Sequence, residues 1–186
     1  MLKVWLLLIA ILPTLISGCG KTARTPDASQ QGQVANKAMV VSAHPDATRI
    51  GVEILRKGGN AFDAAIATQF ALAVAFPAAG NLGGGGFLVY RSTDGSIGSL
   101  DYREMAPAAS TEKMYQDAQG EVIQDLSLSG HLASGVPGSV AGMYETHQKF
   151  GSLPWEELVQ PSIDLARNGV ILTEKEADGL NSNRIR

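Results

Sequence analysis

The strongest pattern in the chain is a run from Ala61 to Phe76 that is apolar almost all round. A helix of that kind must be covered on most of its sides. It would be about 24 Å long, which is short for a membrane crossing, and Pro77 ends it. Asn60 is the expected N-cap, with Asp63 in the first turn. The run therefore predicts a buried helix in a layered domain.

Amphipathic patterns predict further helices on both sides of this run. An apolar stripe that starts after Pro45 predicts a helix that stops at Gly58-Gly59. A short helix is expected over Ser110 to Tyr115, and a longer one over Ser139 to Phe150 that Gly151 ends.

The C-terminal third carries signals for two more helices. Ser152 is expected to cap the first of them, Pro161 to kink or restart it, and Gly169 to end it. Thr173 and Glu176 have the spacing of a capping box for the second.

Strand signals are fewer. Phe87 to Tyr90 and Ile97 to Tyr102 flank the turn dipeptide Asp94-Gly95, which predicts an antiparallel hairpin. Met39 to Ser42 is a short β-like run, and Val170 to Leu172 is expected to be a strand or an extended link.

The N-terminus has the layout of a signal peptide, with Lys3 before an apolar stretch and small residues after it. Ile16-Ser17-Gly18-Cys19 also resembles the lipobox of bacterial lipoproteins, in which the cysteine is lipidated. The alternatives are an uncleaved anchor helix or a signal in which Cys19 is incidental. All three lead out of the cytoplasm, so we expect a periplasmic or cell-envelope protein.

Composition and charge divide the chain into three parts and exclude some classes of partner and site. The expected divisions are a signal peptide at 1–18, a lipidated cysteine and flexible tether at 19–37, and one folded domain at 38–186. The net charge of −3 provides no basic surface for nucleic acid. The single cysteine excludes an internal disulfide and a cysteine-rich metal site.

The motifs that would indicate a phosphate-binding loop, a serine hydrolase or a metal site are incomplete in this sequence. The run Gly83 to Gly86 is followed by Phe87, with no Lys or Ser/Thr to hold phosphate and Mg²⁺. We therefore expect these glycines to allow positive φ angles and the close approach of another segment. No GxSxG motif is present. The histidines lack the spacing of a metal site; they are His44, His131 and His147.

Arg103 is the most informative candidate. It follows a predicted strand and enters a loop that contains Pro107, a common location for ligand contacts. Its planar guanidinium can bind a carboxylate through two hydrogen bonds. From spacing alone, a structural ion pair with Asp101, Glu104 or a distant acid is slightly favoured.

Four strings, in this order, resemble the large subunit of γ-glutamyltranspeptidase (γ-glutamyltransferase, glutathione hydrolase). The resemblance runs from about Val40 to near Leu180. The strings are GGNAFDAA at 58–65, GNLGGGGF at 80–87, DYREMAP at 101–107 and HLASGVPGSVAG at 131–142.

This resemblance implies an N-terminal nucleophile hydrolase fold, an α+β four-layer αββα sandwich of which only the N-terminal portion is present. It implies a precursor that cleaves itself into two subunits and exposes a threonine. That threonine would attack the γ-glutamyl amide of glutathione or a related compound and form an acyl-enzyme. The glutamyl group would pass to water, an amino acid or a peptide, and no metal or other cofactor is needed.

The resemblance assigns one substrate residue to this chain. Arg103 falls on the arginine that binds the α-carboxylate of the γ-glutamyl group. The resemblance therefore favours a substrate contact over the structural ion pair that spacing alone favours. The family's Thr-Thr-His nucleophile context is absent, and Thr146-His147 does not match it. We therefore assign no catalytic residue here, and Gly83 to Gly86 are not an oxyanion hole.

The chain is interpreted as an inactive fragment of a longer precursor, since it ends while its last predicted helix is under way. A cephalosporin acylase, a related N-terminal nucleophile amidohydrolase, is the second enzyme interpretation. A lipid-anchored module that binds an amino-acid-like ligand without chemistry is the third.

Overall fold

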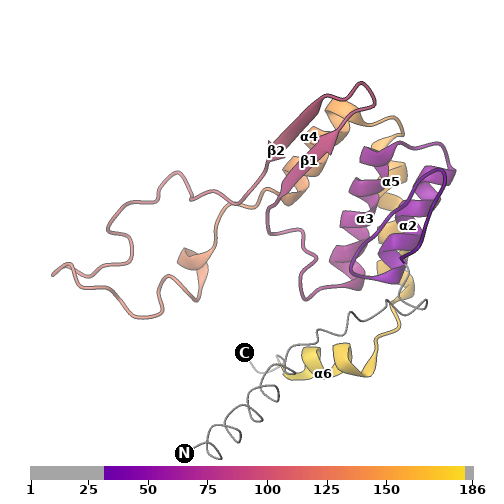
Figure 1. Cartoon of the computed structure of the whole chain (residues 1–186). Helices are drawn as coiled ribbons and strands as arrows, with labels where there is room; N and C mark the ends of the chain where they lie inside the picture. Colours follow the sequence, from indigo (N-terminus) through magenta and orange to yellow (C-terminus); the bar gives the residue numbers. More distant parts are fainter. Residues whose placement is uncertain (1–31, 183–186) are drawn as a thin grey trace, which may run out of the picture. The chain divides into compact units, whose positions relative to one another are not determined.

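The computed structural model describes residues 32–182, and one compact unit begins at Ala38. It contains five α-helices, one antiparallel hairpin and a 3₁₀ turn within the described residues (Figure 1). Their order is α2 (Pro45–Arg56), α3 (Ala61–Ala75), β1 (Phe87–Arg91), β2 (Ile97–Asp101), η3 (His131–Ala133), α4 (Ser139–Phe150), α5 (Trp155–Asn168) and α6 (Glu174–Ser182).

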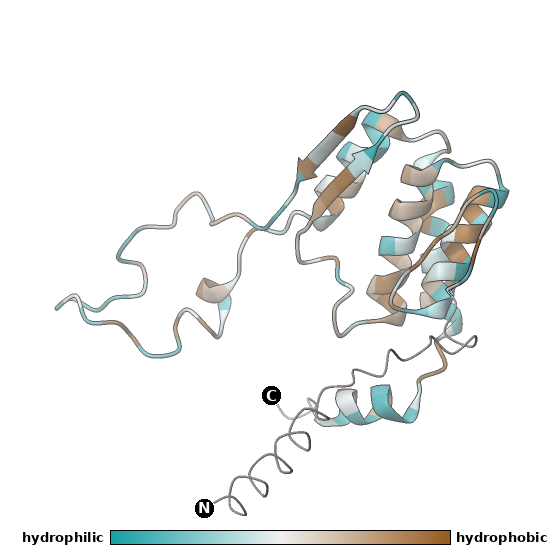
Figure 2. Cartoon of the chain, viewed as in Figure 1, coloured by the Kyte–Doolittle hydropathy of each residue, from teal (hydrophilic) through white to brown (hydrophobic). Residues whose placement is uncertain are grey.

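Helix α3 is the centre of the core, as its apolar sequence predicts. It packs against α2, α4 and α5, and only Ala61 and Ala65 in it are exposed. Ile54 of α2 and Leu158 of α5 are fully buried against it. Figure 2 shows the hydrophobic residues of α2 and α3 within this group of helices. No helix in the described part of the chain is long and apolar enough to cross a membrane.

The start of α3 is fixed by a buried carboxylate. Asn60 caps the helix through Phe62 N–H and Asp63 N–H, and Asp63 accepts the Asn60 N–H at 2.9 Å. Asp63 is fully buried and also accepts both the N–H and the hydroxyl of Ser152. The predicted cap of α5 by Ser152 is therefore wrong, because its side chain is used to join the α4–α5 connection to α3.

The hairpin has one face on the helices and one face open. Phe87 pairs with Asp101 and Arg91 with Ile97, and Gly95 makes the predicted turn with a φ of 88°. The ring of Tyr90 contacts Phe62 at 5.3 Å between centroids. Side chains of the other face, including Phe87, are exposed.

Two sequence predictions of local structure are wrong because packing decides them. Ser110 to Tyr115 forms turns, since this exposed segment has no core to stabilise a short helix. Met39 to Ser42 is not a strand, and Val40 instead packs against the core. At Pro161 the helix does not restart, because α5 continues through it with Leu158 and Ser162 buried nearby; the alternative of a kink stays a prediction. Val170 to Leu172 is an extended link, which is one of the two predicted forms.

Candidate functional site

Arg103 lies two residues beyond the end of β2, where the hairpin pairing continues. Tyr102 donates its N–H to the Gly86 carbonyl at 3.0 Å and accepts the Gly86 N–H at 3.4 Å. This pairing brings Gly85 against Arg103, so close that a Cβ on Gly85 would lie 2.7 Å from the Arg103 Cα. The glycine run and the candidate arginine are therefore parts of one structure.

The same glycine run also binds the start of α4. The Gly84 carbonyl accepts the N–H groups of Gly138 and Ser139 at 2.8 and 2.9 Å. None of the four glycines has a positive φ, so that prediction is wrong. The predicted close approach is confirmed, because residues 102–104 lie where a side chain on Gly85 or Gly86 would stand.

Asn81 is a site residue that the sequence analysis missed. Its Oδ1 accepts the Gly84 N–H at 2.7 Å and the Ser139 hydroxyl at 3.1 Å. One amide thereby holds two segments that are 58 residues apart. Its place in the GNLGGGGF string was the available signal, but the partner Ser139 could not be known without the fold.

Tyr102 anchors the backbone next to Arg103. A Cβ on Gly142 or Gly86 would meet its ring, and a Cβ on Gly138 would meet its carbonyl. Partial burial raises the pKa of the Tyr102 hydroxyl above its ordinary value of 10.0. The strings at 80–87, 101–107 and 131–142 thus converge around Arg103.

The Arg103 guanidinium has no carboxylate partner in the part of the chain that the structure describes: ion pairs form elsewhere in it. Asp101 instead accepts the backbone N–H of Arg103 at 3.0 Å. The Cζ of Arg103 lies 6.0 Å from the centroid of the Phe87 ring. Within residues 32–182, the structural ion pair with Asp101 or Glu104 is therefore not formed.

A hollow of about 350 Å³ lies at this arginine. It is lined by residues of the converging strings and by the first turns of α4, among them Arg103, Met105, Pro137, Ala141 and Glu145. The lining also includes the carboxylates of Asp101 and Glu145, so Arg103 is the one cation in it.

We expect the glycine run to tolerate alanine at one position and not at another. Gly85→Ala should destabilise the protein by about 1–3 kcal/mol, because the new methyl group would overlap the backbone of residues 102–104. Gly83→Ala is the matched control, since nothing lies within 4 Å of its Cβ position. Thermal unfolding of both variants checks this, and equal losses would contradict it.

The other residues singled out in the sequence do not join this site. Cys19 lies outside the described residues. Thr146 is buried in α4 and donates to the Gly142 carbonyl at 2.7 Å, while His147 Nε2 lies 2.8 Å from the Leu153 carbonyl oxygen. Both contacts are structural.

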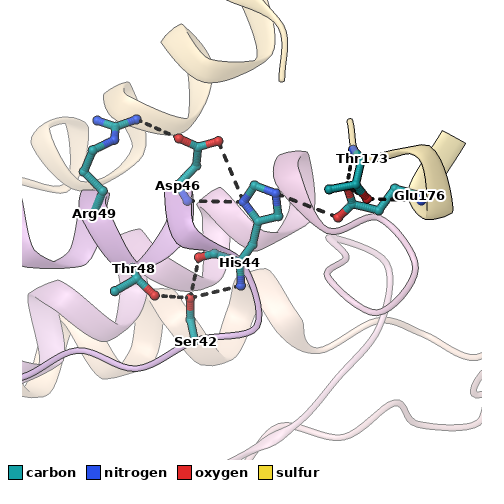
Figure 3. A network of polar contacts seen from close by, with 7 residues as sticks. All are labelled: Ser42, His44, Asp46, Thr48, Arg49, Thr173 and Glu176. Carbon is teal, nitrogen blue, oxygen red and sulfur yellow. Dashed lines mark hydrogen bonds and ion pairs between the residues drawn. The ribbon is translucent and has the colours of Figure 1, made fainter. Parts of the chain in front are cut away.

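His44 belongs to a separate polar cluster at the start of α2 (Figure 3). Its Nδ1 accepts the Asp46 N–H at 3.2 Å, and its Nε2 lies 3.9 Å from Glu176 Oε1. The Thr173 hydroxyl and N–H donate to Glu176, as the predicted capping box requires, and lower the pKa of its carboxyl below 4.5. This contribution to stability is present above pH 4.5 and is lost as the pH falls through the folded value. The cluster links the starts of α2 and α6.

Comparisons with known proteins agree with the resemblance. The family described as gamma-glutamyltranspeptidase matches residues 47–186. The glutathione hydrolase proenzyme of Escherichia coli (strain K12) is 49% identical over 148 residues, which is 80% of this chain and 26% of the relative. This chain therefore spans about a quarter of the length of the curated relatives it matches.

Solved structures share the fold. Helicobacter pylori gamma-glutamyltranspeptidase superposes with a TM-score of 0.79 at 45% identity, over 84% of this chain and 45% of that chain. A cephalosporin acylase from Bacillus halodurans superposes with a TM-score of 0.62 at 29% identity, over 80% of this chain and 29% of that chain. These neighbours are N-terminal nucleophile hydrolases, and the predicted fold class is confirmed.

Proposed function

This chain belongs to the γ-glutamyltranspeptidase family, and we propose that it is the N-terminal part of the large subunit of a precursor that cleaves γ-glutamyl amides. The proposed donors are glutathione and related compounds. The glutamyl group passes to water, an amino acid or a peptide. In this proposal the precursor cleaves itself, and the small subunit supplies the threonine nucleophile.

The observation that carries this proposal for the chain itself is that the Arg103 guanidinium has no carboxylate partner among residues 32–182. A γ-glutamyl group has its α-carboxylate at the end opposite the amide that is cleaved. Arginine matches a carboxylate with two parallel N–H donors and stays charged at any physiological pH. Binding the far end of the substrate in this way fixes where its amide lies.

The reaction itself needs groups that we place outside this chain. A threonine hydroxyl needs a base, which its own N-terminal amine can supply, and the tetrahedral oxyanion needs hydrogen-bond donors. The glycine run is unsuited to that second task, because Gly84 N–H donates to Asn81 and Gly86 N–H donates to Tyr102. Residues 1–186 bind and orient the donor in this proposal.

The test is the activity of the protein encoded by the complete reading frame. We expect it to hydrolyse γ-glutamyl-p-nitroanilide and to release the anilide faster when an acceptor dipeptide is added. Faster cleavage of a cephalosporin amide would favour the acylase interpretation. Binding of glutamate without cleavage of either compound would favour the binding module.

We also propose that the protein is exported to the cell envelope and anchored by a lipid on Cys19. The support is the signal-peptide layout of residues 1–18 and the lipobox-like string that ends at Cys19. Mass spectrometry of the mature N-terminus should find an acylated Cys19, and Cys19→Ser should release the protein from the membrane fraction. An unmodified Cys19 in the mature protein would rule out the anchor.

A further inference from the structure

We infer that Phe87 is a positioning residue for Arg103, whose guanidinium it holds over its ring; the inference rests on the proposed function of Arg103. Phe87 pairs with Asp101 in the hairpin register, and Arg103 follows two residues later. Side chains at such diagonal positions share one face of the sheet and can reach each other. The 6.0 Å between the Arg103 Cζ and the ring centroid is within the range of a cation–π contact.

The ring matters because acidic groups stand close to the arginine along the chain. Asp101 and Glu104 are both exposed on either side of it. A guanidinium that swung to one of these carboxylates would be neutralised and lost to a substrate. In the structure Asp101 accepts the backbone N–H of Arg103, and the guanidinium lies at Phe87 instead.

A contact through the ring face leaves the arginine able to bind. The attraction between a cation and a ring face uses none of the five N–H donors of the guanidinium. A carboxylate partner would occupy two of them. Holding the side chain in advance also reduces the conformational entropy that is lost when the substrate binds.

The backbone on both sides of this contact is fixed. Phe87 directly follows the glycine run, which is hydrogen-bonded to Tyr102 and to the start of α4. Arg103 sits against Gly85 from the other strand. The backbone positions of Phe87 and Arg103 are therefore fixed relative to each other, so that only the torsions of the two side chains remain to be ordered by their contact.

The test uses the complete protein, with fluorinated phenylalanines placed at position 87. Fluorine withdraws charge from the ring face while the shape is nearly kept, so folding is preserved and only the attraction for the cation falls. We expect the KM for γ-glutamyl-p-nitroanilide to rise in steps with each added fluorine while kcat stays constant. Phe87→Leu should raise the KM about two- to fivefold, and Phe87→Trp should keep it near the original value.

Val89→Ala is the matched control. Val89 is the next residue of β1 on the same face and is 74% exposed, against 62% for Phe87. It should leave the KM unchanged. In an Arg103→Ala background, the fluorine series should have no effect, because the cation is gone.

The outcomes separate the two claims. A KM that rises on Arg103→Ala but does not follow the fluorine series would overturn the role of Phe87 and leave the proposed function intact. A KM that is insensitive to Arg103→Ala would overturn both. A fluorine effect of equal size with and without Arg103 would show that Phe87 acts on something else.

Discussion

Replacing Arg103 by alanine should raise the KM of the complete protein for γ-glutamyl-p-nitroanilide by about a hundredfold or more. Two charge-assisted hydrogen bonds contribute about 1.5–3 kcal/mol each, and each 1.4 kcal/mol corresponds to a factor of ten. Because the arginine would bind a part of the substrate that does not react, we expect a smaller fall in kcat. Steady-state kinetics over a wide range of donor concentrations measures both.

Lysine at the same position gives a graded test. Arg103→Lys keeps the charge but offers no planar fork, so we expect an intermediate KM. Arg91→Ala is the matched control, since Arg91 is an exposed arginine at the other end of the hairpin. An unchanged KM in Arg103→Ala would remove this residue from the substrate site.

Replacing Asp63 by alanine should lower the free energy of unfolding by about 2–4 kcal/mol. The carboxylate is fully buried and accepts the N–H of Asn60 and the N–H and hydroxyl of Ser152. Its removal would take the acceptor from the half-buried Asn60 N–H and from the Ser152 groups, and would open a cavity at the start of α3. Urea denaturation followed by circular dichroism measures the loss.

A surface aspartate provides the comparison. Asp94 accepts the Ser96 N–H at 2.9 Å in the hairpin turn, where water can replace it, so Asp94→Ala should cost far less than Asp63→Ala. Asp63→Asn should fall between the two, because the amide keeps one acceptor oxygen. Equal losses in all three variants would show that the buried hydrogen bonds contribute little.

The helices were largely predictable because their signals are local. Pro45 begins α2, Gly151 and Gly169 end α4 and α5, and the pair Thr173 and Glu176 caps α6. Each of these effects acts within one or two turns of the chain. An apolar pattern together with such caps is therefore sufficient to place a helix.

Predictions failed where a distant partner competes with a local one. Ser152 has the form of an N-cap, but Asp63, 89 residues away, takes its hydroxyl. The four glycines were expected to allow positive φ angles, yet none of them has one, and their backbone is hydrogen-bonded to two other segments. Neither competitor can be inferred from neighbouring residues.

The sequence by itself determined the family, the helices of the core and the hairpin, and it identified Arg103 as the candidate substrate residue. Only the tertiary structure decided that the guanidinium has no carboxylate partner in the described part of the chain, that Phe87 lies beside it, and that Asn81 joins the glycine run to α4. The physical reason is the distance along the sequence over which each interaction acts. Propensities and caps depend on residues a few positions apart, whereas the partner of a charge or of a buried amide depends on which segments the folded chain brings together.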